Sequence, residues 1–149
     1  MPAESIVIRA TPEQVWSMVS DVTRIGEWSP EAVGAEWLDG ASAPVVGARF
    51  KGRSKRKGSW ATTCTVSAAS RPREFAFVVG KGETAWSYEL EAQDVGCELR
   101  ESFEILKAPG AVGRFMTKLG TGVRWSEREH DLVLGMQKTL CRLKAAAEG

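Results

Sequence analysis

The chain has 149 residues, 43% of them hydrophobic and 26% charged, and its 20 basic and 19 acidic side chains leave a formal net charge of +1. The length and composition fit one globular domain with a sizeable core. The small net charge means that the protein has no overall positive field that would attract nucleic acid. The sequence shows no signal-peptide pattern and no apolar run of the roughly 18 residues that span a membrane, so we expect a cytoplasmic protein without a transmembrane segment.

The beginning of the chain predicts a strand followed by two short helices. Residues 5–10 alternate in polarity, as a half-buried strand does. The sequence Thr11-Pro12-Glu13-Gln14 is a capping box with proline in the first turn, and it predicts the start of a helix. A second short helix or turn is expected from Thr23 to Trp28. Apolar residues at helical spacing mark the buried face of the first helix: Val15, Met18, Val19 and Val22.

The middle of the chain is strand-like. Turn signals separate segments with strand character at residues 33–39, 48–55, 60–68, 74–80, 84–91 and 97–106. Their short connections predict an antiparallel meander. Alternation along each strand places the large apolar side chains on one face of the sheet, as for Trp86, Tyr88 and Leu90.

The end of the chain predicts a connection and then one long helix. Residues 107–123 are rich in glycine and are interpreted as a flexible connection with a small apolar spot at Phe115, Met116 and Leu119. This segment is either a lid over the mouth of a pocket or a loop or helical turn packed permanently against the domain. An amphipathic pattern from about Arg124 to Ala147 predicts a helix roughly 36 Å long, which must lie across the sheet.

Several short stretches match a known arrangement. They are Thr11-Pro12-Glu13-Gln14-Val15-Trp16, Ser20-Asp21, Trp28-Ser29-Pro30, Trp37-Leu38-Asp39-Gly40, Val46-Gly47-Ala48-Arg49-Phe50, Gly135-Met136, Thr139-Leu140 and Arg142-Leu143-Lys144. In these stretches and in the order of its elements, the chain resembles the START-like (SRPBCC, Bet v 1-like) superfamily, and within it the polyketide cyclase/dehydratase-type branch. The resemblance spans residues 1–149 and implies a single α+β domain with a helix-grip fold. In that fold a curved antiparallel sheet of about seven strands surrounds a long C-terminal helix, with two short helices after the first strand and an apolar cavity between sheet and helix.

The aromatic side chains are candidates for the wall of such a cavity. Trp86 and Tyr88 are favoured because each carries a polar atom that needs a partner when buried. For the other rings, ordinary core packing is the alternative. The candidate ligand-binding residues are Trp28, Trp37, Trp60, Phe75, Phe77, Trp86, Tyr88, Phe103, Phe115, Met116, Val133 and Met136.

Glu101 is the main candidate for a catalytic residue. It is in register with Leu99 and Phe103, on the face assigned to the interior. Burial raises the pKa of a carboxyl group, which suits a general acid or base. The alternative is a bulge or an edge salt bridge that leaves Glu101 in solvent. Tyr88 is the second candidate for proton transfer.

Metal and cofactor sites have no support in the sequence. The single histidine, His130, is expected at the exposed rim of the long helix. The three cysteines lie far apart without a CxxC spacing and are typical of reduced thiols: Cys64, Cys97 and Cys141. No phosphate-binding loop, nucleophile elbow or dinucleotide motif is present. We therefore expect neither a metal nor a cofactor.

One dense run of basic residues lies near residues 51–57. Its alternate members share one strand face: Lys51, Arg53, Lys55 and Lys57. This face is a candidate for docking an acidic carrier protein or an anionic membrane. The alternative is an edge hairpin that its charge protects from aggregation. Nucleic acid is not an expected partner, because a broader patch with exposed aromatics is absent.

Three functions are compatible with these features. The first is binding of a small hydrophobic ligand (a lipid, a polyketide or another aromatic or aliphatic metabolite) between the sheet and the C-terminal helix. The second is an enzyme of the polyketide cyclase/dehydratase type that uses Glu101 or Tyr88 for proton transfer. The third is a surface interaction protein of a stress-response or toxin-like kind, which predicts a small or filled cavity.

Overall fold

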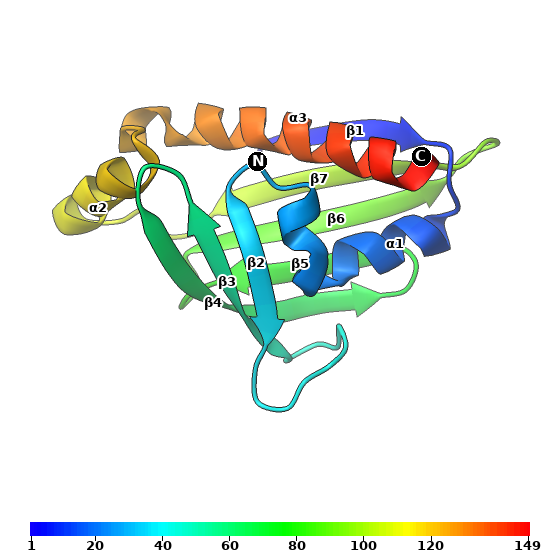
Figure 1. Ribbon diagram of the computed structural model, residues 1–149, viewed down its shortest axis with the longest axis horizontal. Coiled ribbons are helices and arrows are strands. Elements are labelled where there is room, and N and C mark those ends of the chain that lie inside the picture. Colours follow the sequence, from blue (N-terminus) through cyan, green and yellow to red (C-terminus); the bar gives the residue numbers. More distant parts are fainter.

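The computed structural model describes residues 1–149 and shows an α+β domain with the expected helix-grip architecture (Figure 1). Its elements are β1 (Ala3–Ile8), α1 (Pro12–Ser20), the 3-10 helix η1 (Val22–Glu27), β2 (Ala32–Trp37), β3 (Arg49–Lys55), β4 (Ser59–Ser70), β5 (Glu74–Val79), β6 (Thr84–Ala92), β7 (Cys97–Ile105), α2 (Ala111–Thr121) and α3 (Trp125–Glu148). The predicted meander and the predicted long helix are both present. None of the helices combines the length and the hydrophobicity of a membrane-spanning segment.

The strands form one curved antiparallel sheet in the order β1-β7-β6-β5-β4-β3-β2. Each of the strands β2 to β6 pairs with the next along the chain, and β1 forms the far edge by pairing with β7. Figure 1 shows α3 lying lengthwise across the inner face of this sheet, with α1 beside its C-terminal half. The first helix begins as predicted, because Thr11 accepts from the Gln14 backbone N–H at 3.1 Å and the Gln14 side chain accepts from the Thr11 N–H at 3.0 Å.

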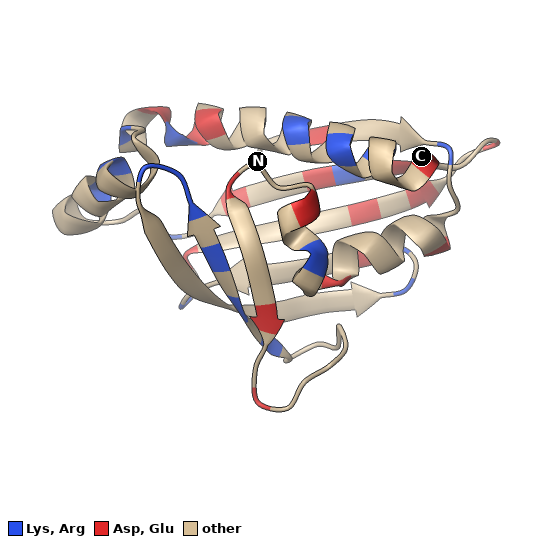
Figure 2. Cartoon of the chain, viewed as in Figure 1, with Lys and Arg blue, Asp and Glu red and all other residues tan.

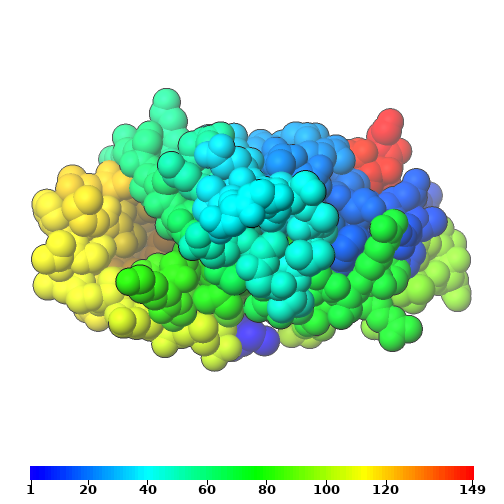
Figure 3. Space-filling model, turned by 90° about the horizontal axis from the view of Figure 1, so that it is seen from below, coloured from blue at the N-terminus to red at the C-terminus, as the bar shows by residue number.

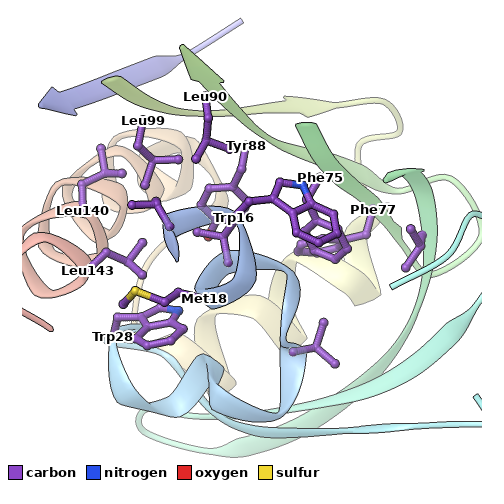
Figure 4. Close-up of a cluster of buried hydrophobic side chains, with 14 of the residues drawn as sticks. Trp16, Met18, Trp28, Phe75, Phe77, Tyr88, Leu90, Leu99, Leu140 and Leu143 are labelled. Atoms are coloured by element: carbon purple, nitrogen blue, oxygen red, sulfur yellow. The ribbon is translucent and has the colours of Figure 1, made fainter. Parts of the chain in front are cut away.

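The solid part of the core lies under α1 and the C-terminal half of α3 (Figure 4). Leu140 and Leu143 of α3 belong to the same core cluster there as Leu90 of β6 and Leu99 of β7. Trp16 of α1 also packs into this region, and its Nε1 donates to the Glu74 carbonyl at 2.8 Å. Helix α1 fills only this half of the space between the sheet and α3. The other half, under the N-terminal part of α3, is not filled by α1.

Two predictions about local structure were wrong. The segment interpreted as a flexible connection contains the eleven-residue helix α2, which ends where Gly122 adopts a left-handed conformation (φ 79°). The strand near residues 48–55 is not at an edge of the sheet, because β3 pairs with β2 on one side and β4 on the other. The edge strands are β1 and β2.

Candidate functional site

A cavity of about 1080 Å³ lies between the inner face of the sheet and the N-terminal half of α3. This volume is at the upper end of the range of small-molecule sites. Figure 3 shows the molecule hollowed between α2, the β3–β4 hairpin and the turn that joins β5 to β6. The apolar wall comes from both layers, with Phe50, Trp60, Phe77 and Trp86 on strands and Leu132 and Met136 on α3.

The mouth of the cavity is closed on one side by a contact between the β3–β4 hairpin and the end of α2. The Gly58 N–H donates to the Gly120 carbonyl at 2.8 Å. A Cβ atom at Gly120 would lie 3.2 Å from Cε3 of the Trp60 ring, so the absence of a side chain allows this close approach. Helix α2 therefore contacts the hairpin through its C-terminal end.

Tyr88 and Glu101 form a titratable pair on the mainly apolar inner face of the sheet, which also carries the hydroxyl groups of Ser54, Thr62 and Thr84. Tyr88 and Glu101 are directly opposite in the pairing of β6 with β7, and both line the cavity. Their exposed fractions are only 6% and 4%, and Glu101 Oε1 is buried without a hydrogen-bond partner. No bulge interrupts β7 near Glu101, so the register argument predicted its inward direction correctly.

Burial controls the protonation of this pair. It raises the pKa of Glu101 to about 8, although hydrogen bonding by the Tyr88 hydroxyl opposes part of the rise. Burial, and then the neighbouring Glu101, raise the pKa of Tyr88 well above its usual value. At neutral pH most Glu101 carboxyl groups therefore carry a proton, and the Tyr88 hydroxyl carries one as well.

A second polar group lines the cavity near the start of α3. The Arg128 guanidinium donates to both carboxylate oxygens of Glu31, each at 2.8 Å, and to Asp131 at 2.6 Å. Arg56 at the tip of the β3–β4 hairpin donates to both oxygens of Asp131, at 2.9 and 2.8 Å. Burial opposes ionisation of Asp131, but the two arginines outweigh it and hold the pKa of this carboxyl below its usual value. These four side chains tie the segment before β2 and the hairpin to α3.

Cys64 is the one thiol in the cavity wall. Burial raises its pKa to about 11, and its Sγ lies 3.9 Å from the Thr62 hydroxyl. A thiol with this pKa stays protonated at neutral pH and is a poor nucleophile. Cys64 therefore contributes packing and polarisability to the wall.

The cavity brings together about half of the residues predicted to bind a ligand. Those that line it are Trp60, Phe77, Trp86, Tyr88, Met116 and Met136, together with Glu101. Those that do not line it are Trp28, Trp37, Phe75, Phe103, Phe115 and Val133. Trp28 and Phe75 are buried in the solid half of the core, whereas Phe115 is 62% exposed.

Two of the rings outside the lining pack against rings that belong to it. Phe103 is opposite Trp86 in the sheet, and their ring centroids are 5.0 Å apart. Trp37 contacts the edge of Phe50 with centroids 5.7 Å apart. Both therefore support the wall from outside the cavity. Val133 lies on α3 beside Leu132, which is the residue that reaches the cavity.

The sequence interpretation missed the group formed by Glu31, Arg56, Arg128 and Asp131. One signal was available, because Arg56 breaks the alternation of the basic run and so belongs to the opposite face of the hairpin from Lys55 and Lys57. The other members come from distant parts of the chain. The outward basic residues are exposed along β3 and its turn (Figure 2): Lys51, Arg53, Lys55 and Lys57.

The structure contains no group of three or more His, Cys, Asp or Glu side chains that could hold a metal ion. His130 is exposed on α3 and lies outside the cavity lining. Its place on the rim of the helix agrees with the pattern of apolar residues, in which Met136, Leu140 and Leu143 form the buried stripe. The buried and half-buried titratable side chains of the cavity are those of the Tyr88–Glu101 pair and of the ion-paired group, together with the Cys64 thiol, whereas the exposed side chains of Glu83, Lys107 and Lys138 complete the lining.

Comparison with known proteins identifies the family. Residues 3–148 match the family model described as polyketide cyclase / dehydrase and lipid transport. The chain is 31% identical to the polyketide-cyclase-like protein Cgl2372 of Corynebacterium glutamicum, with a TM-score of 0.60 over 96% of this chain and 88% of the other. No curated protein matches it.

Other solved structures share the fold at lower identity. Protein BH1534 of Bacillus halodurans is 16% identical, with a TM-score of 0.73 over 99% of this chain and 98% of the other. The di-domain aromatase/cyclase BexL of the BE-7585A biosynthetic pathway is 12% identical, with a TM-score of 0.69 over 99% of this chain and 50% of the other. The match of the family model over almost the whole chain, together with the helix-grip fold, shows that the chain belongs to the polyketide cyclase / dehydrase and lipid transport family.

Proposed function

We propose that the protein binds a small hydrophobic ligand, such as a lipid, a polyketide or another aromatic or aliphatic metabolite, in the cavity between the sheet and α3. The observation that carries this proposal is the buried, unpartnered Oε1 of Glu101 inside a mainly apolar cavity of about 1080 Å³. A buried polar atom without a partner is costly, and a ligand that brings a hydroxyl or carbonyl group to Glu101 and Tyr88 removes that cost. The rest of the ligand would lie against the rings of Trp60, Phe77 and Trp86.

Strand β4 offers a matched test of this site. Thr62 lines the cavity, whereas its neighbour Thr63 is exposed on the other face of the same strand. Thr62→Phe should fill part of the cavity and weaken binding of the neutral fluorescent probe N-phenyl-1-naphthylamine by roughly tenfold. Thr63→Phe should bind the probe as the unmodified protein does. Equal binding by all three proteins would show that the probe does not enter this cavity.

A second candidate function is proton-transfer catalysis of the cyclase/dehydratase type. The Tyr88–Glu101 pair favours it, because a carboxyl group with a pKa of about 8 holds a proton at neutral pH and can release it near that pH. In this function Glu101 transfers the proton and the Tyr88 hydroxyl hydrogen-bonds the carbonyl oxygen of the substrate. The likeness to BexL adds support at the level of fold alone.

Solvent-deuterium exchange separates catalysis from simple binding. The probe is a small 3-ketoacyl thioester, and NMR measures how fast its C2 protons exchange in deuterium oxide. A proton-transfer enzyme should accelerate the exchange, and Glu101→Gln should abolish the acceleration while N-phenyl-1-naphthylamine still binds. An exchange rate equal to that in buffer alone would leave ligand binding as the function.

The basic face of β3 is our candidate for docking an acidic carrier protein. Lys51, Lys55 and Lys57 make no ion pair, whereas Arg53 contacts Glu36 at 3.2 Å. Lys51 and Lys55 therefore offer free positive charge on the exposed face of β3, and Lys57 adds a third exposed charge in the turn, where its side chain lies against Gly122. A triple exchange of these lysines to glutamate should abolish co-migration with an acidic acyl carrier protein in native electrophoresis, and unchanged co-migration would contradict this partner.

A further inference from the structure

Helix α2 turns its large apolar side chains toward the solvent. Val112, Phe115, Met116 and Leu119 follow each other at i, i+3, i+4 and i+7, which places them on one stripe of the helix. Their exposed fractions are 76%, 62%, 58% and 55%. In a surface helix such a stripe normally faces the core. Here it is one of the main groups of exposed apolar side chains on the protein, and we call it the α2 stripe.

The side of α2 that faces the domain is made of small residues. Gly113, Thr117, Gly120 and Thr121 repeat at helical spacing and are the less exposed residues of the helix. Gly120 approaches Gly58 and the Trp60 ring, and the Thr121 hydroxyl donates to the Thr117 carbonyl at 2.7 Å within the helix. Helix α2 thus contacts the domain through these small residues, and its apolar stripe remains available for a partner.

The segment of the chain that carries the α2 stripe has charges of one sign. Lys107, Arg114, Lys118 and Arg124 are exposed in and beside the helix, and no acidic residue occurs from Ile105 to Ser126. Figure 2 shows the basic positions on α2 itself. Within this segment an apolar stripe is accompanied by lysine and arginine alone, although Glu83 of the β5–β6 turn lies beside Lys107. Such a stripe is complementary to an anionic lipid surface, where the apolar side chains enter the acyl boundary and the cations meet the head groups.

We propose that α2 docks the protein on anionic lipid bilayers, with the helix in the plane of the interface and the α2 stripe inserted. The position of the helix supports this occupant, because Met116 and Leu119 also line the cavity. Figure 3 shows α2 at one end of the molecule, directly beside the hollow. Docking through α2 therefore brings the mouth of the cavity to the membrane surface. This surface activity goes beyond ligand binding and does not depend on which ligand the cavity holds.

Sedimentation with lipid vesicles tests the proposal on the complete chain. The protein should sediment with vesicles of phosphatidylcholine and phosphatidylglycerol, and much less with phosphatidylcholine alone. Phe115→Asp should weaken this binding by roughly tenfold. The loss of one cation should weaken vesicle binding roughly fivefold, so the double variant Arg114→Glu, Lys118→Glu should weaken it by more than that factor. Added salt should reduce vesicle binding of the unmodified protein.

The control variants place the same changes elsewhere on the surface. Val95→Asp introduces a charge at an apolar side chain that is 63% exposed in the turn between β6 and β7. Arg142→Glu reverses a charge at an exposed position in the C-terminal half of α3. Both should bind vesicles as the unmodified protein does, and circular dichroism should show that all variants remain folded.

Three results would overturn the proposal. The first is no sedimentation with anionic vesicles. The second is equal loss of binding in the control variants, which would indicate adsorption by general charge. The third is a dimer in native mass spectrometry that Phe115→Asp dissociates while vesicle binding is unaffected, because the α2 stripe would then be covered by a second copy. Binding of N-phenyl-1-naphthylamine by Phe115→Asp separates this result from the proposed function, since Phe115 does not line the cavity.

Discussion

Tyr88 and Glu101 lie directly opposite each other on β6 and β7, and both side chains are buried against the same cavity. The pair places a hydroxyl and a carboxyl group in a wall that is otherwise mainly apolar. Burial raises the cost of charging either group, and a negative charge on Glu101 would raise the pKa of Tyr88 further, whereas the Tyr88 hydroxyl partly lowers the pKa of Glu101. The native state therefore favours the form in which both groups keep their protons.

This preference makes stability depend on pH through Glu101. The carboxyl has a pKa of about 8 in the folded chain against a reference value of 4.5. Below the reference value both states are protonated and folding carries no penalty. As the pH rises through the interval between the two values, the unfolded chain loses its proton first, so the free energy of unfolding falls until the folded carboxyl also ionises. Over the whole interval the loss is on the order of a few kcal/mol.

Glu101→Gln should remove this dependence, because glutamine resembles the protonated acid at every pH. In urea unfolding, the variant should be more stable than the unmodified protein at pH 8 and similar to it near pH 4.5. Glu104→Gln is the matched control, since Glu104 lies on the same strand with an exposed side chain. A constant difference between Glu101→Gln and the unmodified protein at all pH values would contradict the raised pKa.

The sequence predicted the fold well because most of the elements carry local signals. The capping box at Thr11, the alternation of the strands and the long apolar stripe of α3 are all present as expected. Helix α2 escaped prediction because its glycines disfavour a helix and its apolar stripe has no core to face. Its attachment depends on Gly58 and Trp60 of the hairpin, which only the tertiary structure brings to it.

The candidate site was predictable only in part. Period-2 register was sufficient for Tyr88 and Glu101, because β6 and β7 are regular where they pair. It was not sufficient to separate rings of the cavity wall from rings of the solid core. Phe75 and Phe77 share a face of β5, yet only Phe77 reaches the cavity. The difference arises because α1 covers only part of the sheet. The alternation of polarity along β5 carries no information about which part α1 covers.

Trp86 tests the role of the aromatic wall in binding. Trp86→Ala should weaken binding of N-phenyl-1-naphthylamine by roughly five- to tenfold, because the ring lines the cavity and offers a flat apolar face. The domain should remain folded, since Trp86 is only partly buried. Fluorescence titration measures the affinity. Trp37→Ala, which removes a tryptophan that lies outside the lining and packs against Phe50, should weaken binding less than Trp86→Ala does. Normal binding by Trp86→Ala would remove this ring from the site.

Gly96 tests the contact between the β6–β7 turn and the end of β1. It has a φ of 87°, and a Cβ atom there would overlap the carbonyl oxygen of Ile8. Gly82 has a similar φ of 78° but open space around it. Gly82→Ala should therefore cost only the left-handed backbone strain of about 1–2 kcal/mol. Gly96→Ala should cost roughly 3 kcal/mol or more, because β1 must also move. Similar values for both variants in urea unfolding would show that β1 adjusts without cost.

Arg128 tests whether the ion-paired group holds the cavity wall together. Its side chain is only 12% exposed and makes bidentate contact with Glu31 as well as a contact with Asp131. Arg128→Gln removes a positive charge that neutralises the carboxylates of Glu31 and Asp131. For a fully buried ion pair, the loss of one partner lowers the free energy of unfolding by about 3–5 kcal/mol. Because Glu31 and Asp131 remain 23% and 17% exposed, water screens part of the effect, and we expect about 2–3 kcal/mol in urea unfolding.

A double variant and an exposed pair give this measurement its controls. Adding Glu31→Gln to Arg128→Gln should recover part of the lost stability, because it removes one of the carboxylates that the arginine compensated. Arg24→Gln breaks the Arg24–Glu27 pair, whose side chains are 41% and 52% exposed, and should change stability little. If Arg128→Gln also behaves like Arg24→Gln, the segment before β2 is attached to α3 by its apolar contacts, and the wall of the cavity does not depend on these charges.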